Sequence, residues 1–152
     1  MKINNVVVIG SGTMGSGIAA QLCNANIPVT LLDLKTEISQ KAKERIEKSR
    51  PPLLIDKSKI DGIKVGNIND DFNIVSEADW IVEAVVERID IKHDIYDKIF
   101  KQRKKGSIVS SNTSSIPISV LSEKLTEDDK KDFCITHFFN PILFDIWIYS
   151  KL

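Results

Sequence analysis

Residues 6–15 read VVVIGSGTMG, and this stretch decides the fold. Val6–Ile9 is a short, continuous β-branched run that ends at a glycine, which is typical of a strand buried on both faces of a parallel sheet. The glycines that follow form a GxGxxG pattern, and apolar residues then recur with a helical period over 14–25. The pattern therefore leaves a predicted strand and opens a predicted helix, which is the context that a dinucleotide-binding loop requires.

The glycine-rich loop has the residues to hold a diphosphate. Gly10 permits the tight turn, Gly12 lets backbone N–H groups approach the phosphates, and Gly15 lets the helix pack closely on the strand. The helix N-terminus adds partial positive charge at the same place. We expect every residue of this loop to contact the cofactor: Gly10, Ser11, Gly12, Thr13, Met14 and Gly15.

A carboxylate ends the next predicted strand, Val29–Asp33. Asp33 can accept hydrogen bonds from both hydroxyls of an adenosine ribose, and its charge would repel a 2′-phosphate. The sequence therefore predicts NAD as the cofactor, although Lys35 nearby leaves NADP open.

Strand and helix signals alternate along the rest of the chain. Apolar runs predict four further strands, at 72–75, 79–85, 107–111 and 132–139. Helical periodicity predicts helices over 36–50, 91–105 and 118–125. The segment 53–69 is expected to form a second helix or an arm. The alternation predicts a doubly wound α/β domain with a mostly parallel sheet, a Rossmann fold, over residues 1–141.

Composition excludes several classes of partner. The 152 residues are 42% hydrophobic, enough for one core, and 21 Lys and Arg balance 21 Asp and Glu. Without a basic excess, we expect no nucleic-acid or membrane-surface binding. No apolar run approaches the roughly 20 residues of a membrane span, and we expect a cytoplasmic protein. Cys23 and Cys134 have no metal-ligand spacing, so we expect buried free thiols and no metal site.

Two polar segments end predicted strands at the same edge of the sheet: SSNTSS at 110–115 and THFFNP at 136–141. Ligands of open α/β sheets bind at this edge, so these side chains should meet at the nicotinamide end of the cofactor. The serines could instead cap the next helix, and His137 could be a structural histidine. Its place at the strand end favours a catalytic base. We expect His93 to face solvent, and the basic run 101–105 to be a solvated helix end.

Five motifs in order carry a family resemblance: GSGTMGSGIAAQ, LLDL, DWIVEAVVER, SSNTSS and THFFNP. Together they resemble the NAD-binding domain of L-3-hydroxyacyl-CoA dehydrogenases over 6–141. The resemblance implies NAD-dependent oxidation of (S)-3-hydroxyacyl-CoA to 3-oxoacyl-CoA in fatty-acid metabolism, with an acyl-CoA substrate such as acetoacetyl-CoA.

The resemblance also implies roles for individual residues. His137 would accept the proton of the 3-hydroxyl, and Ser114 would hydrogen-bond the substrate oxygen and contact the cofactor. Glu87 and Lys92 match positions around the nicotinamide ribose, with a helix-start ion pair as the alternative. Ser49 matches a serine that touches CoA. The remaining cofactor positions implied are Ala84, Asn112 and, beside the nicotinamide, Asn140.

Residues 142–152 depart from the family pattern. The family continues with a glutamate that pairs with the catalytic histidine, where this chain has Tyr149, and then with a helical substrate and dimerisation domain. We therefore weigh an alternative, a truncated NAD-binding remnant with impaired catalysis. Codons for residues 144–151 that also spell Arg-Tyr-Met-Asp-Leu-Leu-Glu in another frame would indicate a frameshift, which the nucleotide sequence tests. We expect self-association through the apolar end, Ile146, Trp147 and Ile148.

Overall fold

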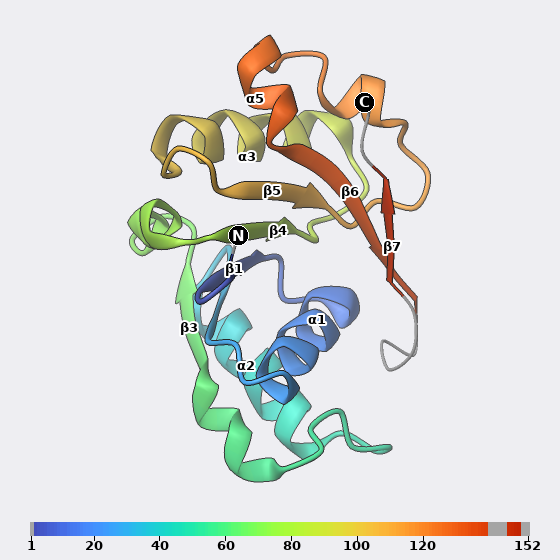
Figure 1. Ribbon diagram of the computed structural model, residues 1–152. Helices are drawn as coiled ribbons and strands as arrows, with labels where there is room; N and C mark the ends of the chain where they lie inside the picture. The colour runs from blue at the N-terminus through green and yellow to red at the C-terminus, as the bar shows by residue number, and fades with distance from the viewer. Residues whose placement is uncertain (1, 140–145, 150–152) are drawn as a thin grey trace.

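A seven-stranded sheet forms the centre of the computed structural model, which describes residues 2–139 and the backbone of 146–149 (Figure 1). The strands are β1 (Val6–Ile9), β2 (Val29–Asp33), β3 (Ile63–Asn67), β4 (Trp80–Glu83), β5 (Ile108–Ser111), β6 (Phe133–Phe138) and β7 (Ile146–Tyr149). Their order is β3-β2-β1-β4-β5-β6-β7. The first six are parallel, and β7 pairs antiparallel with β6. The mostly parallel Rossmann sheet predicted from the sequence is confirmed.

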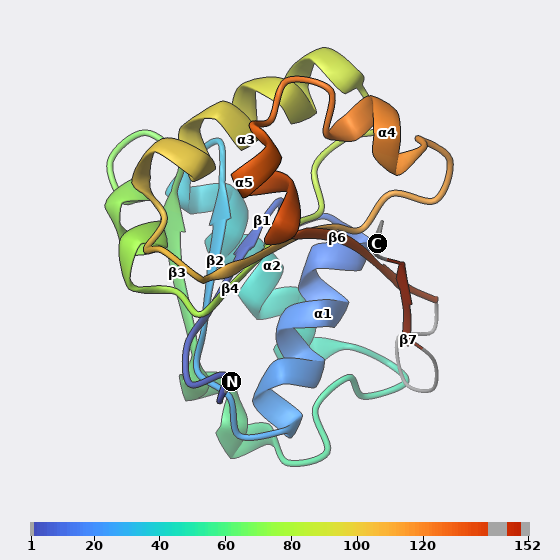
Figure 2. The same ribbon diagram turned by 45° about the horizontal axis from the view of Figure 1, so that its top comes forward.

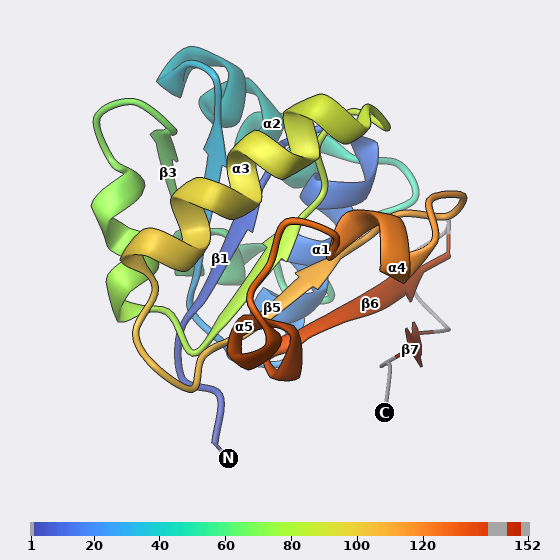
Figure 3. The ribbon, with the colours of Figure 1, turned by 90° about the horizontal axis from the view of Figure 1, so that it is seen from above.

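Helices cover both faces of this sheet (Figures 2 and 3). They are α1 (Thr13–Asn24), α2 (Thr36–Lys48), α3 (Ile89–Gln102), α4 (Ile118–Leu121) and α5 (Glu127–Lys131), with the 3₁₀ turns η1 (Lys57–Gly62) and η2 (Phe72–Glu77). Val6 and Val8 pack in one core with α1 and α2, whereas Val7 and Ile9 pack in the other core with α3. This two-sided burial explains why β1 reads as a continuous apolar run, since each of its four side chains is at most 1% exposed.

The segment between α2 and β4 differs from its prediction. The expected helix or arm at 53–69 contains η1 and the edge strand β3, which pairs only with β2 among the described strands. The strand expected at 72–75 is wrong, because these residues belong to η2. Phe72 and Val75 lie one 3₁₀ turn apart and are both buried, so their spacing of three reflects a helical turn rather than strand alternation.

One expectation about α3 is wrong, and a second, the solvated basic run, holds for four of its five residues. His93 is 8% exposed, and its Nε2 lies 3.0 Å from the carbonyl oxygen of Val120, because α4 covers this face of α3. The basic run is not a uniformly solvated helix end. The side chain of Arg103 is 7% exposed and pairs with Asp129 and Asp132 at 3.2 and 2.8 Å. The helix expected over 118–125 ends at Leu121, and the short α5 follows it.

Both cysteines are free thiols, as expected. Cys23 is buried and Cys134 is half-buried. Burial raises the pKa of both thiols.

Candidate functional site

The glycine-rich loop joins β1 to α1 at the carboxyl edge of the sheet. Gly10 has a φ of +100°, and a Cβ there would lie 2.4 Å from the carbonyl oxygen of Ala84. A Cβ on Gly15 would lie 1.8 Å from the carbonyl oxygen of Gly10. Both glycines are therefore required by the backbone, the first for its conformation and the second for the close approach of α1 to the loop.

At Gly12, neither the backbone conformation nor the packing of the protein requires a glycine. Gly12 precedes α1 with a φ of −63°, and a Cβ there would meet no atom within 4 Å. The first backbone N–H groups of α1 have no partner within the helix, as at any helix N-terminus. The loop thus leaves room for a phosphate at the positive end of a helix, which is the fit that a dinucleotide demands.

Asp33 stands at the end of β2 and is held by the loop. Its Oδ2 atom accepts hydrogen bonds from the backbone N–H of Ser11 at 2.7 Å and from the Ser11 hydroxyl at 2.6 Å. Its Oδ1 atom accepts from the backbone N–H of Leu34 at 2.7 Å. Ser11 therefore orients the carboxylate and occupies both lone pairs of Oδ2, so one lone pair, on Oδ1, remains for a ribose hydroxyl, and a second ribose hydroxyl would replace the Ser11 hydroxyl on Oδ2.

A cavity of about 420 Å³ lies between this loop and the segment after β4. Gly10, Ser11, Gly12 and Asp33 line its polar end, and Ala84, a neighbour of Gly10, also lines it. Apart from Arg45, the rest of the wall is apolar, with Leu34, Ile38, Ile68, Val85, Val86, Ile91 and Ile95. Leu34 and Val86 are 64% and 60% exposed, so they offer apolar surface on which an adenine ring could pack.

Arg45 is a lining residue that sequence reasoning missed. It comes from α2, and its Nη2 atom donates a hydrogen bond of 2.9 Å to the carbonyl oxygen of Ser11. A permanent positive charge therefore lies beside the loop that faces the phosphates. Its position twelve residues after Asp33, in a charged helix, gave no signal that set it apart from the neighbouring lysines.

Ser114 and His137 share a second hollow, of about 270 Å³. Thr113, Ser115, Ile116, Pro117 and Ile135 complete its lining. Ser114 is exposed in the loop after β5, whereas His137 is half-buried near the end of β6 with its ring centroid 4.5 Å from that of Phe139. The sheet edge thus brings together the hydroxyl and imidazole that the sequence placed 23 residues apart.

Glu87 follows a residue of the first cavity in the chain and hydrogen-bonds residues of the second hollow. It follows Val86, which lines the first cavity, and its Oε1 atom accepts hydrogen bonds from the hydroxyls of Thr113 and Ser115 in the second. Lys92 lies 3.2 Å from Oε2, so the helix-start ion pair considered from the sequence is present. Burial alone would raise the pKa of Glu87, but the Thr113 hydrogen bond and the Lys92 charge outweigh it and lower the pKa.

Other expected site residues are placed differently. The Asn112 side chain accepts a hydrogen bond from the backbone N–H of Phe138 at 3.0 Å, so it fastens β5 to the end of β6. Ser49 lies at the far end of α2 from Asp33. Its hydroxyl donates to the Ile46 carbonyl oxygen and accepts from the Leu53 N–H, so it lines neither hollow. Asn140 and the side chains of 146–149 lie outside the described residues.

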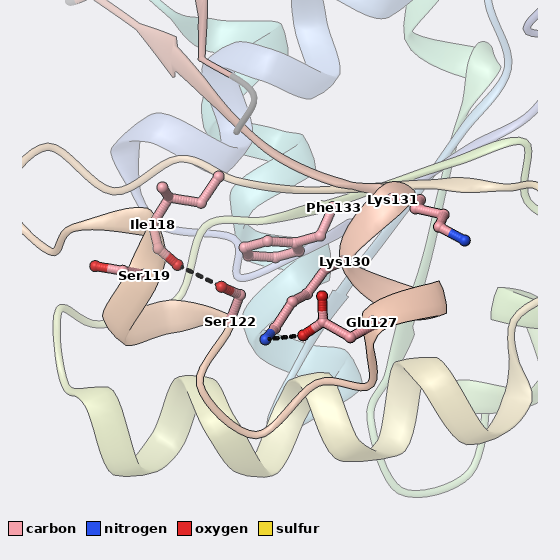
Figure 4. A pocket seen from close by; sticks show the side chains of 7 residues that line it. All are labelled: Ile118, Ser119, Ser122, Glu127, Lys130, Lys131 and Phe133. Atoms are coloured by element: carbon pink, nitrogen blue, oxygen red, sulfur yellow. Dashed lines mark hydrogen bonds and ion pairs between the residues drawn. The ribbon is translucent and has the colours of Figure 1, made fainter. Parts of the chain in front are cut away.

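A further hollow of about 350 Å³ lies between α4 and α5, away from this edge of the sheet (Figure 4). Its polar groups interact with one another: Lys130 pairs with Glu127 at 2.7 Å, and the Ser122 hydroxyl donates to the Ile118 carbonyl oxygen at 2.8 Å. It contains none of the residues expected at the site. Within the described part of the chain, no cluster of three His, Cys, Asp or Glu side chains could hold a metal ion.

The family model described as "3-hydroxyacyl-CoA dehydrogenase, NAD binding domain" matches residues 5–144. The chain belongs to this family. A protein of Deinococcus radiodurans named "Probable 3-hydroxyacyl-CoA dehydrogenase" is 43% identical over 148 residues, which cover 93% of this chain and 43% of the relative. The chain thus spans less than half the length of that curated relative.

Solved structures agree with the family assignment. The (S)-3-hydroxybutyryl-CoA dehydrogenase of Ralstonia eutropha is 29% identical, with a TM-score of 0.76 over 93% of this chain and 51% of that one. The 3-hydroxybutyryl-CoA dehydrogenase of Escherichia coli, 24% identical, shares the fold with a TM-score of 0.85 over 99% of this chain and 33% of that one.

The family assignment confirms NAD as the cofactor. In the 3-hydroxyacyl-CoA dehydrogenase family the substrates are acyl-CoA compounds. Among the described residues, no helix is both long enough and apolar enough to cross a membrane.

Proposed function

We propose that this chain serves in the NAD-dependent oxidation of (S)-3-hydroxyacyl-CoA to 3-oxoacyl-CoA, with cofactor binding assigned to residues 1–141. One observation carries the proposal. Ser114 and His137 share a hollow at the carboxyl edge of the sheet, and Glu87, which follows Val86 of the glycine-loop cavity, accepts hydrogen bonds from two residues that line that hollow. A substrate oxygen in the hollow would therefore lie beside the nicotinamide end of a cofactor whose adenosine end is at Asp33.

His137 and Ser114 have separate roles in this proposal. The imidazole of His137 accepts the proton of the 3-hydroxyl, a task suited to imidazole near neutral pH. The Ser114 hydroxyl donates a hydrogen bond to the same substrate oxygen and holds it facing the imidazole. NAD, when bound, supplies the acceptor for the hydride that leaves C3.

The remaining assignments concern binding. The glycine-loop backbone holds the diphosphate and Asp33 the adenosine ribose. We assign Ala84, Glu87, Lys92, Asn112 and Asn140 to the nicotinamide half of the cofactor. Ser49 is assigned to the CoA moiety, at the outer end of α2.

Acetoacetyl-CoA and NADH provide the test. Loss of NADH absorbance measures turnover, and NADH fluorescence measures cofactor binding in the same preparation. His137→Ala is expected to lower kcat by about 100-fold or more and to leave the Kd of NADH unchanged. Ser114→Ala should also lower kcat, whereas Ser119→Ala, an exposed serine on α4, should not. Turnover that survives His137→Ala would refute the assignment of the base.

A second candidate is an NAD-binding domain that turns over slowly or not at all by itself. The chain spans 43% of the Deinococcus relative. The resemblance implies that the substrate-binding part of the family is a separate helical domain. NADH binding without turnover of acetoacetyl-CoA would favour this candidate over the enzyme.

Self-association through β7 is part of the proposal. Among the described strands β7 has one neighbour, β6, so the backbone groups on its other side are available to pair with a second copy. Sedimentation should show a dimer or larger species at tens of micromolar. A monomer at that concentration would contradict it.

A cytoplasmic location completes the proposal. The free thiols of Cys23 and Cys134 suit a reducing compartment. Fractionation of cells with an antibody to the chain tests the location, and recovery from an oxidising compartment would contradict it.

A further inference from the structure

Glu83, the last residue of β4, is a buried carboxylate that the site does not use directly. It is 0% exposed and accepts four hydrogen bonds. Oε1 accepts from the Lys92 ammonium and from the backbone N–H of Val85, both at 2.8 Å. Oε2 accepts from the Tyr96 and Ser111 hydroxyls, both at 2.6 Å. Burial and the charge of Glu83 raise the pKa of Tyr96, so its phenol stays protonated and donates.

Lys92 connects this carboxylate to Glu87. Lys92 is 1% exposed, and its ammonium lies 2.8 Å from Glu83 and 3.2 Å from Glu87, whose side chain is 39% exposed. Lys92 lies in the first turn of α3, where the helix dipole disfavours a cation. The two carboxylates therefore hold the ammonium where the helix alone would not.

Glu87 in turn holds the loop that carries Ser114. It accepts hydrogen bonds from Thr113 and Ser115, the residues on either side of Ser114. The Thr113 hydroxyl also accepts from the backbone N–H of Ile116 at 3.1 Å, which closes the turn. Both neighbours of the substrate-facing serine are thus tied to one carboxylate.

Stability alone does not account for this arrangement. A buried ion pair returns little net stability compared with apolar side chains of the same volume, because desolvation cancels most of the attraction. The contacts run from Glu83, on the central strand β4, through Lys92 and Glu87 to the loop that contains Ser114. Their effect is to hold that loop in place.

We propose that Glu83 is a positioning residue for Ser114, acting through Lys92 and Glu87. Glu83 fixes the Lys92 ammonium, the ammonium fixes the Glu87 carboxylate, and that carboxylate fixes the Thr113–Ser115 turn. This inference rests on the proposed function, in which Ser114 meets the substrate oxygen.

Amide hydrogen exchange in the whole chain, measured residue by residue by NMR, tests the inference without requiring turnover. In Glu83→Gln the amide of Ile116 should exchange about tenfold faster, as loss of roughly 1.4 kcal/mol of local stability would produce. Amides in the centre of β1 should keep their exchange rates. The double variant Glu83→Gln/Lys92→Met removes both charges together, leaves no buried charge unpaired, and should show the same local effect.

Two comparisons separate positioning from general destabilisation. Asp97→Asn removes a carboxylate from an exposed ion pair with Lys101 on the same helix, and should leave the Ile116 amide unchanged. Glu83→Gln should raise the Kd of NADH about tenfold, because NADH carries the nicotinamide half of the cofactor. The Kd of ADP-ribose, which lacks the nicotinamide, should be unchanged. The inference would be overturned if the Ile116 amide exchanged at the wild-type rate in both Glu83 variants. It would also be overturned if exchange in the centre of β1 accelerated as much as at Ile116. Failure of the proposed function would appear separately, as no turnover by the wild-type chain.

Discussion

Gly12 and Gly15 form a matched pair for testing the glycine-rich loop, because one alanine methyl meets open space and the other meets backbone. At Gly12 the added Cβ has no atom within 4 Å, and φ of −63° is open to alanine. Gly12→Ala should therefore change the free energy of unfolding by less than about 1 kcal/mol. At Gly15 the Cβ would lie 1.8 Å from a carbonyl oxygen, so Gly15→Ala should cost about 3 kcal/mol.

The two variants should separate cofactor affinity from stability. The Gly12 methyl occupies the space left for a phosphate, and losing one charge-assisted hydrogen bond costs about 1.5–3 kcal/mol, which raises the Kd of NADH by about 10- to 100-fold. Fluorescence titration measures this Kd. Thermal unfolding should show a Tm shift below about 4 °C for Gly12→Ala and a loss of about 6–12 °C for Gly15→Ala. Gly12→Ala with wild-type affinity would refute the placement of the diphosphate at this loop.

Three further outcomes follow from particular contacts. Asp33→Asn removes the charge that disfavours a 2′-phosphate, so the ratio of NADH to NADPH affinity should fall at least about tenfold in parallel titrations; an unchanged ratio would place the preference elsewhere. Arg103→Met removes both ion pairs of a side chain that is 7% exposed, so the free energy of unfolding should fall by about 2 kcal/mol in a denaturant titration. A denaturation midpoint equal to that of the wild type would contradict this. The pKa of Glu87 is lowered on folding, so its stabilisation is present above the ordinary value of 4.5 and is lost as the pH falls through the lowered pKa. Glu87→Gln should remove that part of the acid dependence of Tm, and an unaltered profile would show that Glu87 does not contribute.

The sequence predicted the parts of the fold in which one physical requirement dominates. Val6–Ile9 is buried on both faces of the sheet. Each of the three glycines has its own structural reason: a tight turn at Gly10, open space at Gly12 and close packing of α1 at Gly15. Asp33 ends a strand beside them, Ser114 follows β5, and His137 lies near the end of β6 at the same edge. These positions depend on local pattern and on the rule that parallel strands end together.

The features that were not predicted from the sequence depend on contacts between segments that are distant along the chain. β3 is an edge strand with Lys64 and Gly66 among its five residues, and its pairing with β2 overrides a weak local signal. His93 is covered by α4, which its own helix does not reveal. Glu83 is the one carboxylate in the otherwise apolar run WIVEAVV, which indicates that it has a buried partner but does not identify that partner as Lys92.

A crystal structure of the chain with bound NADH tests the central claim most directly, namely that one continuous site runs from the glycine loop to His137. We predict the adenosine ribose on Asp33, the diphosphate over Gly12, and the nicotinamide directed to the hollow that Ser114 and His137 line. A nicotinamide directed away from that hollow would contradict it.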